Sequence, residues 1–500
     1  MDEIELKLQV PAARRAAVDA AVAGRTPLPR MRLQAAYHDT ADRALAAARL
    51  ALRLRREGRQ WVQTLKGATD DGMTRLEHNL PRGAAAAMPA IDPALHAGTP
   101  AGERLAAVLA ATPGSALQTL YRTDIHRRTR ALRVRANGAP ASRVELAFDS
   151  GRIVAGDASI AVCELEIELL AGSPRAVIAT ARAWLPRFGL WLDGRSKAER
   201  GDLLARGETM APARSAQPLQ LDAEMDARAA WQAVLRNCAE QILANASQIA
   251  AGEHAAEHVH QLRVGLRRLR SALALFEIDD TALGEGAASL FRGLGAARDG
   301  AVLEGEFGAA LNAAMRGAGL SVDEPQRSEI GADTASTELL RSAPNQTLLL
   351  DLLSAMHAEA ASATAITPMP LREQLAARLN RWHRELVADA KRYTTLDDAQ
   401  RHQLRKRAKR LRYATEFCAA LFGRRDVRRY LRVLRALQER LGAVSDALMA
   451  IEAFAPRAPT EPHAMFALGW LAARREALID AAAPELKAFT KVERFWKKKR

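Results

Sequence analysis

A strict alternation of charged and aliphatic residues at the start of the chain limits the possible folds more than any other feature. Successive side chains of a β-strand point to opposite faces of the sheet. The stretch 2–8, DEIELKL, therefore places Glu3, Glu5 and Lys7 on one face and its aliphatic residues on the other. A solvated edge strand has the same pattern, so this stretch alone leaves both a surface and an interior position open.

The same alternation recurs over the following residues. Arginines alternate with aliphatic residues in 49–55 (RLALRLR), and charged residues appear at the same spacing in 61–66 (WVQTLK) and 74–77 (TRLE). Much later, 163–168 (CELEIE) brings three glutamates to one face of one strand. Like charges this close repel each other by about 1 kcal/mol at 4 Å in water, and several-fold more in a drier site. We therefore expect a cation beside these carboxylates.

Length and charge restrict the class of protein further. A chain of 500 residues is longer than one hydrophobic core usually serves, so two or more domains are expected. A net charge of +15 favours a polyanionic partner, which includes nucleic acid, polyphosphate and an anionic membrane surface. The three cysteines lack metal-ligand spacing and suit a reducing compartment. Without a leader-like start or an apolar run of membrane-spanning length, the expected location is the cytoplasm, with no membrane partner.

Residues 1–205 are predicted to form a meander of antiparallel strands with a few covering helices. The predicted strands after the first lie at 33–39, 49–57, 60–67, 73–81, 117–135 (as one bent strand or two), 142–149, 152–157 and 161–169. The turn signals lie at 57–58, 71–72, 137–138 and 150–151, and the helices at 11–23, 173–188 and 196–204. Periodicity leaves open whether the charges face solvent, as in a sandwich, or line the lumen of a closed barrel.

Seven motifs follow one another in this half of the chain. They are Glu3-x-Glu5-x-Lys7, Tyr37-His38-Asp39-Thr40, Leu52-Arg53-Leu54-Arg55, Lys66, Arg75-x-Glu77, Glu164-x-Glu166-x-Glu168 and Ser196-Lys197-x-x-Arg200. In this order the motifs resemble those of the CYTH, or triphosphate tunnel metalloenzyme, family. The resemblance implies an eight-stranded antiparallel tunnel that binds a linear triphosphate together with Mg²⁺ or Mn²⁺.

The resemblance also implies roles for individual residues. The implied metal ligands are Glu3, Glu5, Glu164, Glu166 and Glu168. The implied substrate-binding residues are Lys7, Arg53, Arg55, Lys66, Arg75, Glu77, Arg127, Lys197 and Arg200. Within this set Glu77 is a partner of Arg75 or a metal ligand, and neighbouring arginines are alternatives to Arg127. Asn79 stands where many family members have a further acid, so a second metal site stays open.

Phosphoanhydride hydrolysis requires these residue types independently of the family. The reaction needs the charge on the transferred phosphoryl and on the leaving group to be neutralised, and a water to be aligned for attack. Hard divalent cations prefer carboxylate oxygens, and guanidinium groups match pairs of phosphate oxygens. We hypothesise that a metal on Glu3, Glu5, Glu164 and Glu166 orients and acidifies the attacking water, while the cations stabilise the departing diphosphate.

Beyond a polar linker predicted at 206–219, the pattern becomes helical up to the end of the chain. An internal repeat relates 260–270 to 402–412, which begins 142 residues later. On a helical wheel each copy has an apolar stripe and a basic stripe. The basic stripes consist of His260, Arg263, Arg267 and Arg270 in the first copy, and His402, Arg405, Lys409 and Arg412 in the second. A solvated helix face usually mixes charge signs, so two purely basic stripes favour anion binding.

Four motifs carry a second resemblance. They are Val259-His260-Gln261-Leu262-Arg263, Leu294-Gly295-x-x-Arg298-Asp299, Lys409-Arg410-Leu411-Arg412-Tyr413 and the closing Phe495-Trp496-Lys497-Lys498-Lys499-Arg500. They resemble the CHAD domain, and they imply an all-α duplicated bundle over 220–500 whose basic face binds inorganic polyphosphate. The similar halves are expected at about 220–320 and 347–500, with a loose connection over 321–346. The expected fold class is thus an α+β multidomain protein, a β-tunnel followed by a helical bundle.

Three functions remain open at this stage. The leading hypothesis is a metal-dependent triphosphatase of inorganic triphosphate whose second domain binds polyphosphate. The second keeps the fold but changes the activity to thiamine triphosphate hydrolysis or ATP cyclisation, although residues 1–205 contain no aromatic-rich stretch for a base or thiazolium ring. The third is a polyphosphate or nucleic-acid binder without turnover. An aromatic content of 5% disfavours single-stranded nucleic acid but leaves it open.

Overall fold

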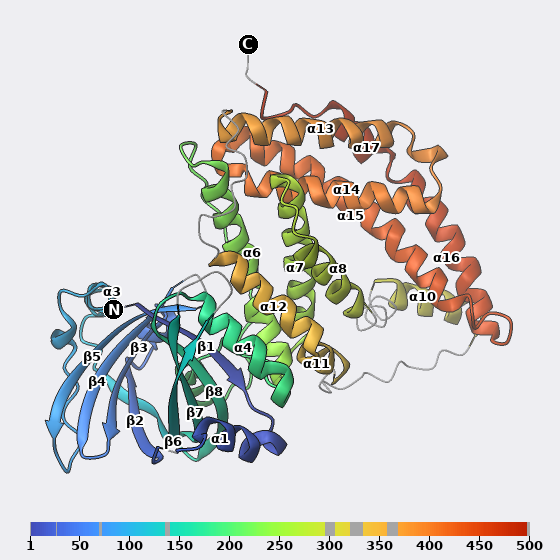
Figure 1. Cartoon of the computed structure of the whole chain (residues 1–500). Helices are drawn as coiled ribbons and strands as arrows, with labels where there is room; N and C mark the ends of the chain where they lie inside the picture. The colour runs from blue at the N-terminus through green and yellow to red at the C-terminus, as the bar shows by residue number, and fades with distance from the viewer. Residues whose placement is uncertain are drawn as a thin grey trace. The chain divides into compact units, whose positions relative to one another are not determined.

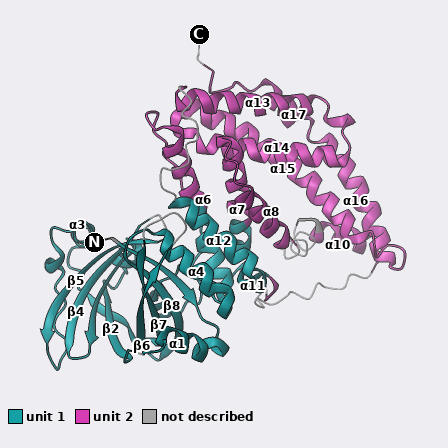
Figure 2. Ribbon diagram, in the orientation of Figure 1, with its two compact units in different colours: residues 1–215, 239–262, 336–359 teal, residues 216–238, 263–335, 360–500 magenta. Residues whose placement is uncertain are grey.

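The computed structural model describes residues 2–26, 28–69, 73–135, 141–295, 306–320, 334–357 and 369–497. The chain forms two compact units (Figure 2). The first unit comprises Met1–Ser215, Ala239–Leu262 and Ser336–Glu359, and the second comprises Ala216–Cys238, Arg263–Ala335 and Ala360–Arg500. The first unit therefore contains helical segments that come from far beyond the β-rich part of the sequence.

Eight antiparallel strands of the first unit close into a barrel (Figure 1). The strands are β1 Asp2–Gln9, β2 Met31–Asp39, β3 Leu50–Glu57, β4 Gln60–Ala68, β5 Thr74–Ala84, β6 Gln118–Val134, β7 Ser142–Ala155 and β8 Ala158–Ala171. Their order is β5-β4-β3-β2-β6-β7-β8-β1, and β1 also pairs with β5 at Asp2–Ile4, which closes the ring. A two-residue strand, β9 Trp191–Leu192, adds to β1. The predicted eight-stranded antiparallel tunnel is confirmed.

The charged face of the strands lines the barrel interior. Lys66 on β4 contacts Glu3 on β1, although β4 and β1 are not neighbours in the sheet. Such a contact is possible only across the lumen of the barrel. The alternating aliphatic residues, such as Leu52 and Leu65, point outward and are fully buried under α3 Pro100–Ala111. The alternation seen in the sequence thus separates a charged lumen from an apolar outer surface.

Other helices cover further parts of the barrel. They are α1 Arg15–Ala23, α2 Ala44–Ala47 and α4 Arg175–Phe188. The last helix of this β-rich part, α5 Lys197–Ala205, packs instead on the lumen face, where Leu204 and Ala205 contact an apolar cluster that includes Tyr121 and Ile153. Gly201 permits this approach, because a Cβ at that position would lie 2.3 Å from the ring of Tyr121.

The prediction of a turn at 150–151 was wrong, because 142–149 and 152–157 belong to one continuous strand, β7. Gly151 lies within this strand, opposite Ile125. A Cβ at Gly151 would lie 2.0 Å from the carbonyl oxygen of Asp124, so the glycine serves close approach of β6 and not a turn. The chain reverses at Gly156, whose φ is +55°. The predicted turns at 71–72 and 137–138 lie outside the described residues.

The rest of the described chain is helical, as predicted. Two helices, α6 Ala227–Ala251 and α7 Ala256–Phe276, each contribute to both units. The helices of the first unit also include α11 Thr334–Arg341 and α12 Ala343–Met356. The second unit contains α8 Thr281–Gly293, α10 Glu306–Gly317, α13 Leu371–Lys391, α14 Asp398–Phe417, α15 Arg424–Phe454, α16 Pro462–Asp480 and α17 Ala483–Lys491. None of the described helices has both the length and the apolar character of a membrane span.

The predicted loose connection over 321–346 was wrong for its second part. Residues 334–346 are helical, in α11 and the start of α12, and Pro344 occupies the first turn of α12, where a missing amide hydrogen costs nothing. The part from 321 to 333 lies outside the described residues, as do Arg298 and Asp299 of the predicted motif.

Candidate functional site

Three buried carboxylates converge in the barrel lumen. Asp149 lies on β7 opposite Glu164 of β8, and Glu166 follows two residues later on the same face of β8. One oxygen from each of the three lies within 4.8 Å of the others. The ammonium of Lys197, the first residue of α5, lies 2.6 Å from Asp149 and 2.9 Å from Glu166, and it also contacts Glu164. We refer to these three carboxylates as the acid triad.

Two arginines complete the surroundings of the acid triad. Arg127 on β6 donates two hydrogen bonds of 2.7 Å to Asp149 and contacts Glu166. Arg200, one turn after Lys197 on α5, contacts Glu164. The neighbouring Arg128 points to the outside of the barrel, where it pairs with Asp19 at 2.9 Å. Among the predicted alternatives, Arg127 is therefore the arginine that the fold directs to the triad.

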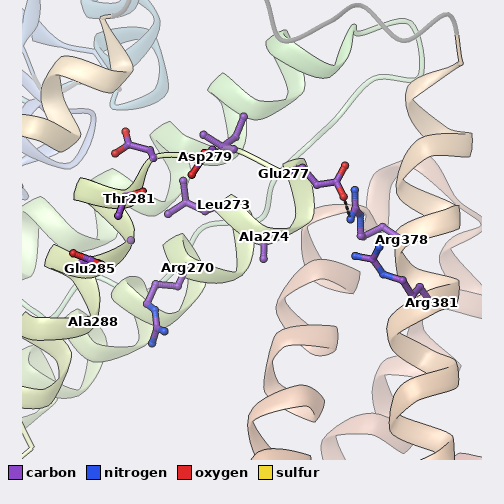
Figure 3. Close-up of a pocket in the computed structure, with 13 residues that line it drawn as sticks. Arg270, Leu273, Ala274, Glu277, Asp279, Thr281, Glu285, Ala288, Arg378 and Arg381 are labelled. Carbon is purple, nitrogen blue, oxygen red and sulfur yellow. Dashed lines mark ion pairs between the residues drawn. The ribbon is translucent and has the colours of Figure 1, made fainter.

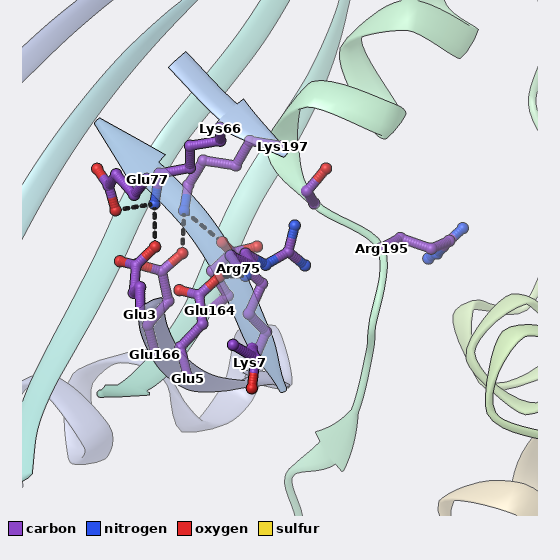
Figure 4. Close-up of polar contacts among 12 residues, drawn as sticks. Glu3, Glu5, Lys7, Lys66, Arg75, Glu77, Glu164, Glu166, Arg195 and Lys197 are labelled. Carbon is purple, nitrogen blue, oxygen red and sulfur yellow. Dashed lines mark hydrogen bonds and ion pairs between the residues drawn. The ribbon is translucent and has the colours of Figure 1, made fainter. Parts of the chain in front are cut away.

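A second cluster of charges occupies the part of the lumen formed by β1, β4 and β5 (Figure 4). The ammonium of Lys66 lies 2.6 Å from Glu3 and 2.9 Å from Glu77. The amide of Asn79 donates to Glu77 at 2.8 Å and accepts a hydrogen bond from Thr64 at 2.7 Å. A neutral amide thus supports Glu77 where the family usually has another acid.

Glu5 and Lys7 of β1 lie between this cluster and the acid triad. Glu5 contacts Lys7 and accepts a 2.7 Å interaction from Nε of Arg75. The β1–β8 register places Lys7 opposite Glu166 and Glu5 opposite Glu168. All of these side chains face the lumen, so the fold brings together most of the residues predicted for the tunnel.

The remaining predicted tunnel residues share the lumen face but have other partners. Arg53 on β3 donates to the hydroxyl of Tyr37 at 3.1 Å. The Nε of Arg55 donates to Glu57 at 2.7 Å. Glu168 lies on β8 beyond Glu166, and burial raises its pKa. These residues extend the charged surface along the lumen away from the acid triad.

The balance of charges sets the ionisation of the lumen carboxylates. Burial would raise the pKa of Glu5, but Lys7, Lys66 and Arg75 outweigh it and lower the pKa to about 2. Burial is likewise outweighed at Glu166, whose pKa Lys197, Arg127 and Lys7 hold well below the usual value. Glu3 is the exception, because burial raises its pKa to about 8 and the nearby carboxylates of Glu77 and Glu5 add to the rise against the opposing effect of Lys66.

The acid triad has the chemistry of a divalent-cation site. Its three donors are carboxylate oxygens, which Mg²⁺ and Mn²⁺ prefer. A cationic group already lies among them, because the ammonium of Lys197 contacts all three. The pKa of Lys197 is raised, since Asp149, Glu164 and Glu166 outweigh the effect of burial. The residues present therefore fit a metal ion, with Asp149 as a candidate ligand that the sequence motifs had not indicated.

Asp149 was missed because its strand carries no repeated acidic motif. The signal that could have found it is the pairing of β7 with β8, since residues opposite each other in neighbouring strands share a face. In sequence, Glu145, Ala147 and Asp149 alternate with Leu146 and Phe148. That alternation marks Asp149 as a lumen residue once Glu164 is known to be one.

A basic groove of about 920 Å³ lies in the second unit. Among its described lining residues, nine are Lys or Arg, one is His402, and Glu385 is the single carboxylate. The basic lining residues are Arg263, Arg267, Arg270, Arg381, His402, Arg405, Lys406, Arg407, Lys409 and Arg410. The groove thus brings the basic stripes of α7 and α14, far apart in the sequence, to one surface.

Six of the eight residues predicted for polyphosphate binding line this groove: Arg263, Arg267, Arg270, His402, Arg405 and Lys409. Burial and the neighbouring Lys406, Arg405 and Lys409 lower the pKa of His402. Arg412 is not among the lining residues and pairs with Glu416 at 3.1 Å. His260 is exposed on α7 in a segment that belongs to the first unit.

Aromatic side chains support the arginines of the basic groove. The guanidinium of Arg410 lies 4.3 Å from the ring centre of Trp382, and that of Arg263 lies 4.4 Å from the ring centre of Phe291. Trp382 is only 4% exposed. The rings therefore hold the guanidinium planes in place and do not offer a free face for stacking a nucleic-acid base.

A second pocket of about 620 Å³ adjoins the basic groove and shares Arg270 and Arg381 with it (Figure 3). Its other charged lining residues include Glu277, which forms an ion pair with Arg378, and the acidic residues Asp279, Asp280 and Glu285. Carboxylates and cations are mixed here, so this pocket does not repel or attract anions as strongly as the basic groove does.

Comparison with known families identifies both halves. The family model of the CYTH domain matches residues 1–201, and that of the CHAD domain matches residues 233–455. Both resemblances predicted from the motifs are confirmed, in the predicted order.

Individual relatives match parts of the chain. An inorganic triphosphatase from Haemophilus influenzae is 29% identical over 173 residues, which is 34% of this chain and 44% of that relative. The match thus spans less than half of the curated relative. The crystal structure of the CHAD domain from the plant Ricinus communis is 31% identical, with a TM-score of 0.46 over 56% of this chain and 98% of that one. A candidate adenylyl cyclase from Hippeastrum, described as having a dominant triphosphatase activity, is 17% identical, with a TM-score of 0.28 over 42% of this chain and 97% of that one.

Proposed function

We propose that this chain, which has a CYTH domain followed by a CHAD domain, is a metal-dependent triphosphatase that hydrolyses inorganic triphosphate in the barrel lumen. The observation that carries the proposal is the buried acid triad, which faces the lysines and arginines of a closed barrel. A site that binds a metal ion and a phosphate chain together needs both signs of charge in one enclosed space. The name of the Haemophilus influenzae relative supports the same activity.

The acid triad of Asp149, Glu164 and Glu166 would hold Mg²⁺ or Mn²⁺, and Glu3 and Glu5 are further candidate ligands along the lumen. When bound, such an ion polarises a phosphoryl oxygen and lowers the pKa of a coordinated water.

The cations of the lumen neutralise the phosphate chain. Lys197 and Arg127 contact the acid triad directly, while Lys66 and Arg75 contact the carboxylates of β1 and β5. These groups would exchange carboxylate partners for phosphate oxygens when the substrate enters. The planar guanidinium of Arg127, which already makes two parallel bonds to Asp149, suits two oxygens of one phosphoryl group. The same cations would then stabilise the charge on the departing diphosphate.

Burial strengthens these interactions. Glu164 is fully buried and Glu166 is 8% exposed. Charges in a site from which water is excluded interact several-fold more strongly than at the surface. The lumen can therefore stabilise the transition state without reorganising solvent.

A substrate panel tests the proposed activity. The full chain is assayed with inorganic triphosphate, thiamine triphosphate and ATP, each with Mg²⁺ and with Mn²⁺. We expect the highest kcat/KM with inorganic triphosphate and release of orthophosphate. Cyclic AMP as the main product would exclude the hydrolase and favour a cyclase of the same fold.

We also propose that the basic groove binds inorganic polyphosphate. The excess of nine Lys or Arg residues over one carboxylate among its described lining residues supports this partner. The buried aromatic rings support a phosphate chain over a single-stranded nucleic acid, which would need exposed stacking faces. Competition between a long-chain polyphosphate and a single-stranded oligonucleotide for the full chain decides between the two. Tighter binding of the oligonucleotide at equal salt would contradict the proposal.

A further inference from the structure

The segment 191–196 places α5 in the barrel lumen. Its first two residues form β9, which pairs with β1 at Leu8 and Gln9. The backbone N–H of Asp193 then donates to the carbonyl of Lys7 at 3.0 Å. Ser196 ends the segment as the N-cap of α5, with its hydroxyl accepting from the N–H of Glu199. Since Lys197 comes next, the position of this segment decides where Lys197 and Arg200 enter the lumen.

Helix α12 holds the first part of this segment. The backbone N–H of Leu192 donates to the side-chain carbonyl of Gln346 at 2.7 Å. The amide nitrogen of Gln346 donates in turn to the carbonyl of Leu340 at 2.7 Å, and Gln346 is only 1% exposed. The guanidinium of Arg341 lies 4.0 Å from the ring centre of Trp191. Burial of these polar groups makes the hydrogen bonds of Gln346 costly to lose.

Helix α6 holds the second part. The backbone N–H of Gly194 donates to the hydroxyl of Ser247 at 3.0 Å. The side chain of Arg195 points away from the acid triad (Figure 4), where it pairs with Asp193 and donates to Gln248 at 3.3 Å. Ser247 and Gln248 are both 2% exposed. Two helices therefore fix the same short segment through buried polar groups.

These contacts join the two matched families within one compact unit. Gln346 and Ser247 lie in the region that matches the CHAD domain, and the segment 191–196 lies in the region that matches the CYTH domain. All of them belong to the first unit. The helical part of the chain thus has a direct structural connection to the residues that contact the acid triad.

We propose that Gln346 and Ser247 are positioning residues that act through the segment 191–196 to keep Lys197 and Arg200 in the lumen. The consequence for activity rests on the proposed triphosphatase function, whereas the structural consequence does not. Small displacements of a charged group at a reacting centre cost large factors in rate, so loosening of this segment should reduce turnover. The bundle would then set the activity of the tunnel even where it does not bind substrate.

The structural part is tested by hydrogen–deuterium exchange on the full chain. Gln346→Leu and Ser247→Ala are compared with Thr337→Val, a matched control whose buried hydroxyl donates to Ile249 at 3.0 Å in the same unit. We expect both test variants, and not the control, to raise exchange at the amides of Glu199 and Arg200, which start α5. Unchanged exchange at these amides in both test variants would overturn the proposal.

The functional part is tested by a double-mutant cycle in triphosphate hydrolysis. We expect Gln346→Leu to lower kcat/KM about tenfold, mainly through kcat, in the wild-type background. In the Lys197→Ala background it should have little further effect, because Gln346 acts through the segment that positions Lys197. Equal losses in both backgrounds would overturn this coupling. A wild-type chain without any hydrolysis would instead refute the proposed function, and the exchange experiment would still decide the positioning role.

Discussion

The barrel lumen and the basic groove both present lysines and arginines, but they differ in the partners of those cations. In the lumen, Lys66, Lys197 and Arg127 each contact at least two carboxylates. In the basic groove, nine Lys or Arg residues share a surface with one carboxylate among the described lining residues. The first region balances its charges, and the second leaves a large positive excess.

This difference separates two ways of handling a phosphate chain. An excess of positive charge attracts any polyanion and releases counterions, which gives affinity without chemistry. A balanced set of buried charges gives up carboxylates to a metal ion at the same time as it gives cations to phosphate, and this exchange is what phosphoryl transfer requires. The comparison predicts that variants in the lumen abolish turnover, whereas variants in the groove change binding alone.

The largest effect is expected from Asp149→Asn. Loss of partners outside a metal's ligand shell typically costs 10–100-fold in affinity or activity, so loss of a triad carboxylate should lower kcat/KM for triphosphate by about 100-fold or more. Steady-state phosphate release measures this. The matched control is Asp124→Asn on the adjacent strand, since Asp124 forms an exposed pair with Arg32 outside the lumen and should change activity little. Equal losses in the two variants would remove Asp149 from the site.

A tenfold effect is expected from charge reversal in the basic groove. Lys409→Glu should weaken polyphosphate binding about tenfold, because it replaces an attraction by a repulsion close to the chain. Arg412→Glu on the same helix is the control, since Arg412 pairs with Glu416 and does not line the groove. Titration calorimetry with polyphosphate at fixed salt gives both affinities, and triphosphate hydrolysis should be unchanged. A larger loss for Arg412→Glu would place the binding surface elsewhere on α14.

A smaller effect is expected from pH in the metal-free protein. The pKa of Glu3 is raised to about 8 in the folded state from an ordinary value of 4.5. Between these values the folded side chain keeps its proton while the unfolded one is ionised, so stability from this group falls as pH rises. The fall is at most about 1.4 kcal/mol per pH unit and is complete above pH 8.

Denaturant unfolding at pH 6 and pH 7, in the presence of a chelator, measures this dependence. We expect the wild type to lose more stability over this interval than Glu3→Gln, whose side chain does not titrate. Identical changes in the two proteins would show that Glu3 is ionised in the folded state at pH 6. No such fall is expected from Glu5, whose pKa is lowered to about 2 and whose contribution is lost only in acid.

The sequence predicted the barrel well because alternation is a local property of each strand. The motifs from Glu3 to Arg200 indicated the lumen face, and the register of β1 with β8 brings Lys7 opposite Glu166 as that reading requires. Features that depend on contacts between distant segments were out of reach. Asp149 gains its meaning only from the strand opposite, and Gly151 has the composition of a turn although the backbone of β6 is the reason for it.

The helical part was predictable in its basic stripes but not in its grouping. The repeat at 260–270 and 402–412 indicated two similar surfaces, and the fold combines most of their residues in one groove. No local pattern indicated that Gln346 and Ser247 contact the segment 191–196, because buried polar residues on helices resemble any other interior position. Helical structure in 334–346 was missed since Pro344 indicated a break, although proline is suited to the first turn of a helix.

The most direct test of the central claim is orthophosphate release from inorganic triphosphate by the full chain, with Mg²⁺ or Mn²⁺ and after chelation, for the wild type and Glu164→Gln. Glu164 is fully buried and contacts Lys197 and Arg200, so its charge serves no surface role. We predict release by the wild type that requires a divalent metal and that Glu164→Gln reduces by at least about 100-fold. Release that survives chelation, or that is unchanged in Glu164→Gln, would contradict a metal-dependent centre at the acid triad.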